Sequence, residues 1–155
     1  MRHRQAIALL ALIGLFVALY LWLYKIGVIS SLRCGTGTCE LVQASRYAVF
    51  LGVPVAFYGV VGYAALLAVA VVGLQPRYVT RPGPTRLLAA LAVTGFLFSA
   101  YLTAIELFVL DAICRWCVGS AVIITAITAI ALPGLRTRSP RTDPSTTPRP
   151  MDRPM

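Results

Sequence analysis

Charged residues are scarce in this sequence, at 12% of 155 residues, and only five of them are acidic. An ordinary soluble domain carries about twice that charged share. The few charges also leave four long uncharged segments, at 5–24, 47–76, 87–105 and 116–135. Each approaches or exceeds the ~20 apolar residues that cross a hydrocarbon core. The scarcity of charge therefore excludes an ordinary soluble protein and predicts one membrane domain over 1–133.

The uncharged segments predict an all-α fold, a bundle of four membrane-spanning helices at about 5–25, 47–75, 86–110 and 113–132. The first segment follows a basic start and resembles a signal peptide, whose apolar region spans about 7–15 residues. This apolar run is longer, and we therefore expect a membrane anchor. In the second segment, Pro54 predicts a short half-helix or a re-entrant piece ahead of it.

The connecting segments differ in composition. The loop at 26–46 is rich in Gly, Ser and Thr, which favour turns over regular structure. The loop at 75–84 is short and carries three prolines that break helices. From residue 134 onward the chain has almost no apolar residues, and we expect the tail at 134–155 to be disordered.

The net charge of +9 would suit nucleic-acid binding, but its distribution indicates membrane topology instead. If four helices alternate, one side receives Arg2, Arg4, Arg77, Arg81, Arg86, Arg136, Arg138, Arg141, Arg149 and Arg153. The other side receives only Lys25, Arg33, Arg46 and Arg115. Positively charged loops stay in the cytoplasm, so both termini are predicted to be cytoplasmic and 26–46 to lie outside. The basic excess also attracts anionic lipid headgroups.

Cysteine is absent from the predicted cytoplasmic loop and from the tail. All four cysteines, Cys34, Cys39, Cys114 and Cys117, fall on the predicted outer side or at its interface. External compartments are oxidising and permit disulfides. We therefore expect the two pairs to meet in space, although they are far apart in the sequence.

The stretch ICRWCVGS at 113–120 places a C-x-x-C pair where the fourth helix is predicted to begin. Residues three apart share a helix face, and a helix N-terminus next to Arg115 favours the thiolate, which is the nucleophile. Cys117 lies almost one turn deeper, where it can react with a lipid-soluble molecule. The loop CGTGTC at 34–39 is expected to be flexible and to relay electrons by thiol–disulfide exchange.

Two other interpretations stay open on the residues alone, and both describe a non-catalytic membrane protein. One is a pair of structural disulfides, although the loop closed by C-x-x-C is too small to gain much stability. The other is a zinc site made of all four cysteines, because C-x4-C with C-x2-C fits metal-ligand spacing. An oxidising compartment and the nearby lipid favour the redox relay over both.

Two stretches, CGTGTCELVQASRYAVFLGVPVAFYG at 34–59 and YLTAIELFVLDAICRWCVGS at 101–120, resemble the vitamin K epoxide reductase family in its bacterial branch. The resemblance implies a protein of the bacterial inner membrane that supports disulfide formation in exported proteins. It also implies that Cys34 exchanges with a separate thioredoxin-like protein outside the cell membrane. Cys39 would then reduce the Cys114–Cys117 disulfide, and Cys117 would contact a quinone, either ubiquinone or menaquinone.

The resemblance further implies a quinone pocket in the outer half of the bundle. We expect Ser45, Tyr47, Tyr58 and Leu102 to line it beside Cys117, although Ser45 equally suits a helix N-cap. Family members that reduce vitamin K epoxide carry an Asn and a Tyr where this sequence has Val55 and Ala121. Neither replacement can hold or protonate an epoxide oxygen, and a quinone is therefore the expected substrate.

Two acidic residues remain near the outer ends of the helices. Glu106 lies about a turn from the end of the third helix, and an ionisable residue inside a membrane is a functional candidate by default. Either it relays a proton to the quinone, or it is a carboxylate that reaches the interface or pairs with Arg46 or Arg115. We expect Asp111 to be the N-cap of the fourth helix.

Overall fold

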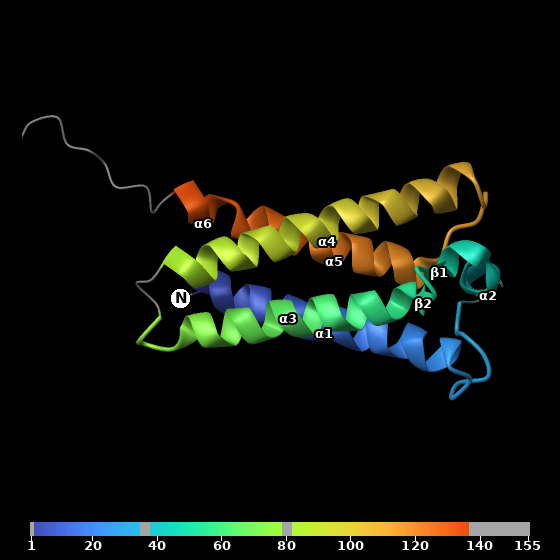
Figure 1. Ribbon diagram of the computed structural model, residues 1–155, viewed down its shortest axis with the longest axis horizontal. Coiled ribbons are helices and arrows are strands. Elements are labelled where there is room, and N and C mark those ends of the chain that lie inside the picture. The colour runs from blue at the N-terminus through green and yellow to red at the C-terminus, as the bar shows by residue number, and fades with distance from the viewer. Residues whose placement is uncertain (1, 35–37, 79–81, 137–155) are drawn as a thin grey trace, which may run out of the picture.

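The computed structural model describes residues 2–34, 38–78 and 82–136. Four long helices dominate it: α1 (Arg2–Lys25), α3 (Val55–Leu74), α4 (Pro82–Phe108) and α5 (Arg115–Ala131). They alternate in direction along an elongated bundle (Figure 1), in which α1 packs against α3 and α5, and α4 packs against the same two helices. All four are long and apolar enough to cross a membrane. The predicted all-α membrane bundle of four helices is confirmed.

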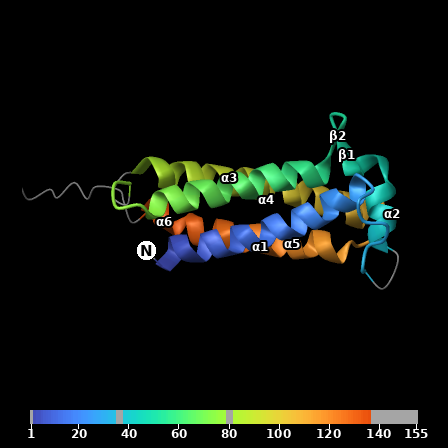
Figure 2. The ribbon, with the colours of Figure 1, turned by 90° about the horizontal axis from the view of Figure 1, so that it is seen from below.

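The two ends of the bundle carry different structures. The basic end holds the start of α1, the connection from α3 to α4, and the short helix α6 (Pro133–Arg136). The cysteine end holds α2 (Thr38–Ala44), a 3-10 helix (Arg46–Ala48), the strands β1 (Val49–Phe50) and β2 (Val53–Pro54), and the turn from α4 to α5. Figure 2 shows the strand pair projecting from the side of the bundle at that end.

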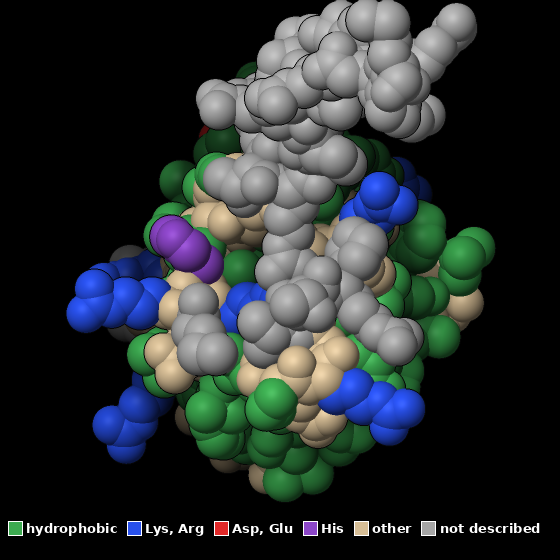
Figure 3. All heavy atoms as spheres, turned by 90° about the vertical axis from the view of Figure 1, so that its left-hand side faces the viewer, with side chains coloured by type: hydrophobic (Ala, Val, Ile, Leu, Met, Phe, Trp, Pro, Cys, Tyr) green, Lys and Arg blue, Asp and Glu red, His purple; other side chains and the backbone are tan. Residues whose placement is uncertain are grey.

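Lys and Arg side chains gather at the basic end of the bundle. Figure 3 looks onto this end and shows Lys and Arg side chains spaced around its rim among hydrophobic ones. Arg4 lies inside the rim, where its guanidinium donates hydrogen bonds to the carbonyl oxygen of Gly73 and, over 2.9 Å, to the hydroxyl of Thr85. It therefore ties the first turn of α1 to the last turn of α3 and the first turn of α4.

Large apolar side chains cover the outside of the bundle. Leu9, Phe16, Leu97 and Val122 are 60–63% exposed, although each belongs to the middle of a long helix. A soluble monomer rarely exposes apolar side chains so densely. In a bilayer the same side chains would contact lipid, which agrees with the length and apolar composition of the four helices.

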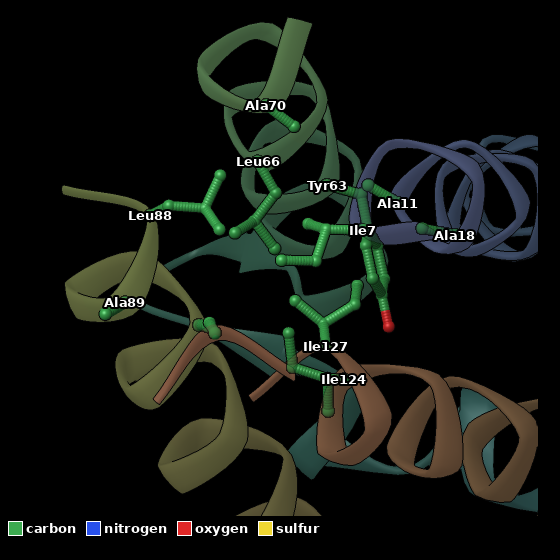
Figure 4. Packing of buried hydrophobic residues seen from close by; sticks show 12 residues of the cluster. Ile7, Ala11, Ala18, Tyr63, Leu66, Ala70, Leu88, Ala89, Ile124 and Ile127 are labelled. Atoms are coloured by element: carbon green, nitrogen blue, oxygen red, sulfur yellow. The ribbon is translucent and has the colours of Figure 1, made fainter. Parts of the chain in front are cut away.

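Small residues bring the helices together inside the bundle. The buried cluster in Figure 4 draws on all four long helices, and five of its members are alanines of α1, α3 and α4: Ala11, Ala18, Ala70, Ala89 and Ala92. The ring of Tyr63 lies directly against Gly14 of α1, and Gly59 faces Ala18 across the same interface. Without a hydrophobic force between helices in lipid, such close van der Waals contact drives their association.

The second helix begins later than the sequence predicted. Instead of a half-helix before Pro54, the chain forms a 3-10 turn and a two-residue hairpin, in which Phe50 pairs with Val53. Leu51 and Gly52 at its tip have φ of 51° and 80°, as a type I′ turn requires. That turn matches the twist of the strands, and Pro54 closes the hairpin where α3 starts.

Three further expectations about local structure are corrected. The loop at 26–46 contains the helix α2, since it packs Cys39 and Val42 into a buried cluster. The third spanning helix, expected from about 86, begins at Pro82. Proline fits there because the N–H groups of the first helical turn have no partner within the helix, so the N–H that proline lacks is not missed. Asp111 is not the N-cap of α5: that position belongs to Cys114, and Asp111 turns the chain with a φ of 46°. Of the tail predicted to be disordered at 134–155, residues 134–136 are helical in α6, and 137–155 lie outside the described residues, where disorder stays a prediction.

The contact of Gly14 with Tyr63 gives a test of the packing. A Cβ at Gly14 would lie 2.3 Å from the Tyr63 ring, too close for any real contact. We expect Gly14→Ala to destabilise the fold by about 1–3 kcal/mol, the usual cost of overpacking, measured as a lower thermal unfolding midpoint in detergent. Gly119→Ala is the matched control, since a Cβ there meets nothing within 4 Å. Equal midpoints for the two variants would contradict this packing.

Candidate active site at the cysteine end

Cys34 and Cys39 form a disulfide that joins the segment after α1 to the first turn of α2. Both are buried, Cys34 with 3% of its surface exposed and Cys39 with none. The hydroxyl of Thr38 donates a hydrogen bond of 3.0 Å to the carbonyl oxygen of Ile113, just before α5. The disulfide is therefore held against the start of α5. Of the loop expected to be flexible at 34–39, Thr38 and Cys39 belong instead to the helix α2, and 35–37 lie outside the described residues.

The structure brings all four cysteines into one place. Cys34, Cys39 and Cys114 belong to a single buried apolar cluster, and Cys117 packs against it. The rest of the cluster comes from α1, α2 and the segments beside them: Leu21, Leu32, Val42 and Ala112. The disulfide thus lies beside the C-x-x-C pair, as a relay between the two pairs requires.

Cys114 and Cys117 are free thiols at the start of α5. Cys114 is the N-cap, and its sulfur accepts a hydrogen bond of 3.4 Å from the backbone N–H of Cys117. The hydrogen bond from the Cys117 thiol lowers the pKa of Cys114. The backbone N–H groups of Cys117 and Trp116 reinforce this effect, whereas burial and the Glu106 carboxylate oppose it. Cys114 is therefore a thiol whose thiolate the start of the helix stabilises.

Glu106 turns its carboxylate toward the two thiols. It is buried, with 6% of its surface exposed, and accepts a hydrogen bond of 3.1 Å from the backbone N–H of Cys114. The Cys117 sulfur also lies within hydrogen-bonding reach of this carboxylate. The alternative in which Glu106 pairs with Arg46 or Arg115 does not describe this arrangement: among the described residues neither arginine forms an ion pair with Glu106, and the Arg46 guanidinium donates to the Tyr47 hydroxyl.

Below the thiols lies an apolar cavity of about 460 Å³. Residues of α1, α3, α4 and α5 line it, together with residues from α2 to the hairpin at the cysteine end. Of the four cysteines, all within the described part of the chain, Cys117 alone lines this cavity. Cys114 is fully buried in the cluster that holds the disulfide, and it does not line the cavity.

Most of the residues expected in a quinone pocket do line this cavity: Ser45, Tyr47, Val55, Tyr58 and Leu102. Ala121 does not. The cavity meets α5 on the edge that carries Ser120 and Ile124, and the residue after Ser120 points roughly a quarter-turn away. Ser45 stands at the N-cap of the 3-10 helix, yet its hydroxyl donates back to the carbonyl oxygen of Val42, 2.7 Å away.

Six polar residues in the cavity wall escaped the sequence analysis: Gln43, Tyr63, Thr94, Ser99, Thr103 and Ser120. Helical spacing was a usable signal for Ser120, which follows Cys117 by three residues and shares its face. The same signal was available for Tyr63, four residues after Gly59. Nothing in the sequence indicated that Gln43 would be buried, because its place depends on how α2 folds over the bundle.

An aromatic wall closes one side of the cavity. Phe50 of the hairpin contacts Tyr58 of α3 and Phe98 of α4, with ring centroids about 6 Å apart. The Tyr58 hydroxyl donates a hydrogen bond of 3.2 Å to the carbonyl oxygen of Phe50. The hairpin is therefore a fixed part of the cavity.

The four cysteines do not form the zinc site that was the alternative to a redox relay. Among residues 2–34, 38–78 and 82–136, no three His, Cys, Asp or Glu side chains gather as metal ligands. Two of the four sulfurs that a zinc site would use are bonded to each other.

A membrane bundle with a disulfide packed beside two free thiols defines a membrane thiol oxidoreductase. A sequence model of the vitamin K epoxide reductase family matches residues 5–132, and the chain belongs to that family. Its members are quinone-linked in general, and this chain presents a free thiol to an apolar cavity.

The pKa of Cys114 can be tested because Cys34 and Cys39 are joined in a disulfide, so that only Cys114 and Cys117 titrate as thiols. We expect the thiolate absorbance of Cys114, followed against pH, to appear at higher pH in Cys117→Ala, because the thiol that lowers its pKa is gone. Cys117→Ser is the matched control, since a hydroxyl can donate the same hydrogen bond. A Cys114 transition at the same pH in both variants would show that Cys117 does not set this pKa.

Proposed function

We propose that this protein reoxidises a thioredoxin-like partner outside the cytoplasm and passes the electrons to a quinone. One observation carries the proposal: the free thiol of Cys117 lines an apolar cavity of about 460 Å³, while the other cysteine pair, as a disulfide, packs against Cys114. A cavity of this size and character suits a small, largely apolar ring system. The partner, once oxidised, can introduce disulfides into exported proteins.

The electrons follow a balanced series of exchanges. Two partner thiols reduce the Cys34–Cys39 disulfide and become a disulfide themselves. The Cys39 thiolate then attacks Cys114 of the Cys114–Cys117 disulfide and releases Cys117, and Cys34 displaces Cys114 from Cys39. This restores the Cys34–Cys39 disulfide and leaves both helix thiols reduced, the redox state seen here. Finally the two thiols become a disulfide, and their two electrons and two protons convert quinone to hydroquinone.

Burial supports the division of labour between the two loop cysteines. Both belong to the cluster around Cys114, but Cys34 follows the exposed Arg33 and keeps 3% of its surface exposed, whereas Cys39 has no exposed surface. We therefore assign contact with the external partner to Cys34 and exchange with Cys114 to Cys39. The arginines at the basic end favour its placement in the cytoplasm, with the cysteine end outside.

The cavity wall favours a quinone over an epoxide. Val55 lines the cavity with an apolar side chain, and Ala121 lies outside it. Neither offers a donor to an epoxide oxygen, which must be held and protonated as its ring opens. Reduction of a quinone carbonyl makes a smaller demand, because the oxygen stays bonded to the ring and only gains a proton.

Glu106 is our candidate for moving that proton. Its carboxylate lines the cavity and lies within hydrogen-bonding reach of the Cys117 sulfur, so it can accept the thiol proton as the sulfur reacts and pass it to a quinone oxygen. A positioned general acid–base group speeds such a transfer by about 10²–10⁴-fold.

Quinone reduction by the purified protein tests the proposal, with a small dithiol as donor and the ultraviolet absorbance of the quinone as readout. We expect reduction by the wild type and loss of activity to background in Cys117→Ser, which cannot form the second disulfide. Val118→Ala is the control, because this neighbour on α5 is 41% exposed and does not line the cavity. Failure of the wild type with both ubiquinone and menaquinone, with zinc bound and all four thiols protected from alkylation, would establish the zinc site instead.

The role of Glu106 has its own test. We expect Glu106→Gln to slow quinone reduction about 100-fold or more near neutral pH, because the amide can hold the Cys114 N–H but cannot carry a proton. Glu40→Gln is the matched control, because the Glu40 carboxylate accepts a hydrogen bond from the Leu32 N–H and does not line the cavity. A wild-type pH–rate profile in Glu106→Gln would remove Glu106 from proton transfer and leave it a structural role at the start of α5.

A further inference from the structure

The proposed reaction leaves one question about the cavity: which group holds the quinone by its oxygen. Val55 and Ala121 stand where relatives that act on the epoxide use an amide and a phenol, and neither can donate a hydrogen bond. We propose that the Ser120 hydroxyl, oriented by Tyr63, donates a hydrogen bond to one carbonyl oxygen of the quinone and holds the ring beside Cys117. This inference rests on the proposed function and adds a residue that determines how the substrate binds.

Ser120 is well placed for this contact. It follows Cys117 by three residues on α5, so the two side chains share a helix face, and both line the cavity. A ring that reaches the Cys117 sulfur therefore has Ser120 about one turn of helix away, toward the middle of the bundle.

Tyr63 fixes the orientation of Ser120. The Tyr63 oxygen lies 2.9 Å from the Ser120 carbonyl oxygen and 2.9 Å from the Ser120 hydroxyl oxygen. The phenol has one proton, and when it donates to the carbonyl, the serine hydroxyl can only be the donor in the second contact. The Ser120 proton can then turn from Tyr63 to a quinone oxygen, while Tyr63 keeps its own bond to the carbonyl.

The position of Tyr63 is itself determined by three helices. Its ring leaves α3, lies against Gly14 of α1, and points its oxygen toward α5 (Figure 4). Only 5% of its surface is exposed. A donor held this firmly loses little freedom when substrate binds, and it needs no rearrangement as negative charge develops on the quinone oxygen.

Among the other hydroxyls of the cavity wall, those of Thr94, Ser99 and Thr103 belong to α4 and not to the helix that carries Cys117, and two more bond backbone carbonyl oxygens. Tyr58 donates to the carbonyl oxygen of Phe50, and Ser45 donates to that of Val42. Both bonds end on carbonyl oxygens of the segment from α2 to the hairpin, which forms part of the cavity wall. The Tyr63–Ser120 pair differs because only one of its two hydroxyl protons bonds a backbone carbonyl oxygen, that of Ser120. The other proton is shared between the two hydroxyl oxygens.

The reaction needs no proton from Ser120. Quinone and the two thiols of Cys114 and Cys117 give hydroquinone and one disulfide, which accounts for both protons and both electrons. The serine hydrogen bond strengthens as charge builds on the oxygen, so it contributes to binding and to the rate.

The test compares four purified variants in the quinone reduction assay, with short-chain ubiquinone and menaquinone as probes. We expect Ser120→Ala to raise the KM for quinone about 3- to 10-fold, as the loss of one hydrogen bond predicts. Tyr63→Phe should raise it as well, since the serine hydroxyl is then free to bond its own helix. Ser120→Thr keeps the donor and should stay near the wild type. Thr125→Val is the control, because this hydroxyl on α5 bonds Ala121 outside the cavity.

An infrared measurement separates a bond to substrate from a structural effect. Carbonyl-labelled quinone bound to the oxidised protein should show a lowered carbonyl stretching frequency, and Ser120→Ala should lose that shift. Wild-type KM and an unchanged infrared band in both Ser120→Ala and Tyr63→Phe would overturn this inference while quinone reduction stands. A wild type that neither reduces nor binds quinone would overturn the proposed function, and the inference with it.

Discussion

A bilayer offers the backbone no hydrogen-bond partner, and this constraint shapes the whole molecule. The spanning segments are continuous helices because only a helix satisfies its own N–H and C=O groups within one segment. In the described residues the connections lie at the two ends of the bundle, and the cysteine end holds α2, the hairpin and the turn before α5. All four cysteines lie at the cysteine end, Cys39 in α2, Cys117 in α5, and Cys34 and Cys114 outside the helices.

The bundle contains a cavity because small and bulky residues are unevenly distributed along its length. Alanines and Gly14 let the helices approach closely toward the basic end, where the buried cluster is dense. Nearer the cysteine end, Gly59, Gly62 and Gly95 line the cavity and fill little of it. The aromatic contacts of Phe50, Tyr58 and Phe98 then keep the space from collapsing. An apolar cavity in contact with a thiol is the outcome.

The two helix thiols differ through their positions on one turn of α5. Cys114, at the N-cap, receives hydrogen bonds from the start of the helix and faces the disulfide cluster. Cys117, one turn deeper, faces the cavity and the carboxylate of Glu106. The spacing of C-x-x-C therefore places two sulfurs one helix turn apart in different surroundings, the disulfide cluster for Cys114 and the cavity for Cys117.

The sequence by itself determined the fold class, the number of spanning helices, the grouping of the cysteines and the family. These follow from composition and from local spacing, and lipid gives an apolar segment of that length few alternatives to a helix. The tertiary structure alone decided the helix in the loop at 26–46, the hairpin before α3, the partner of Glu106 and the exclusion of Ala121 from the cavity. It also decided the contact of Tyr63 with Ser120, two residues 57 positions apart. Such contacts depend on how the helices rotate and approach one another, and that depends on packing between side chains that no local pattern brings together.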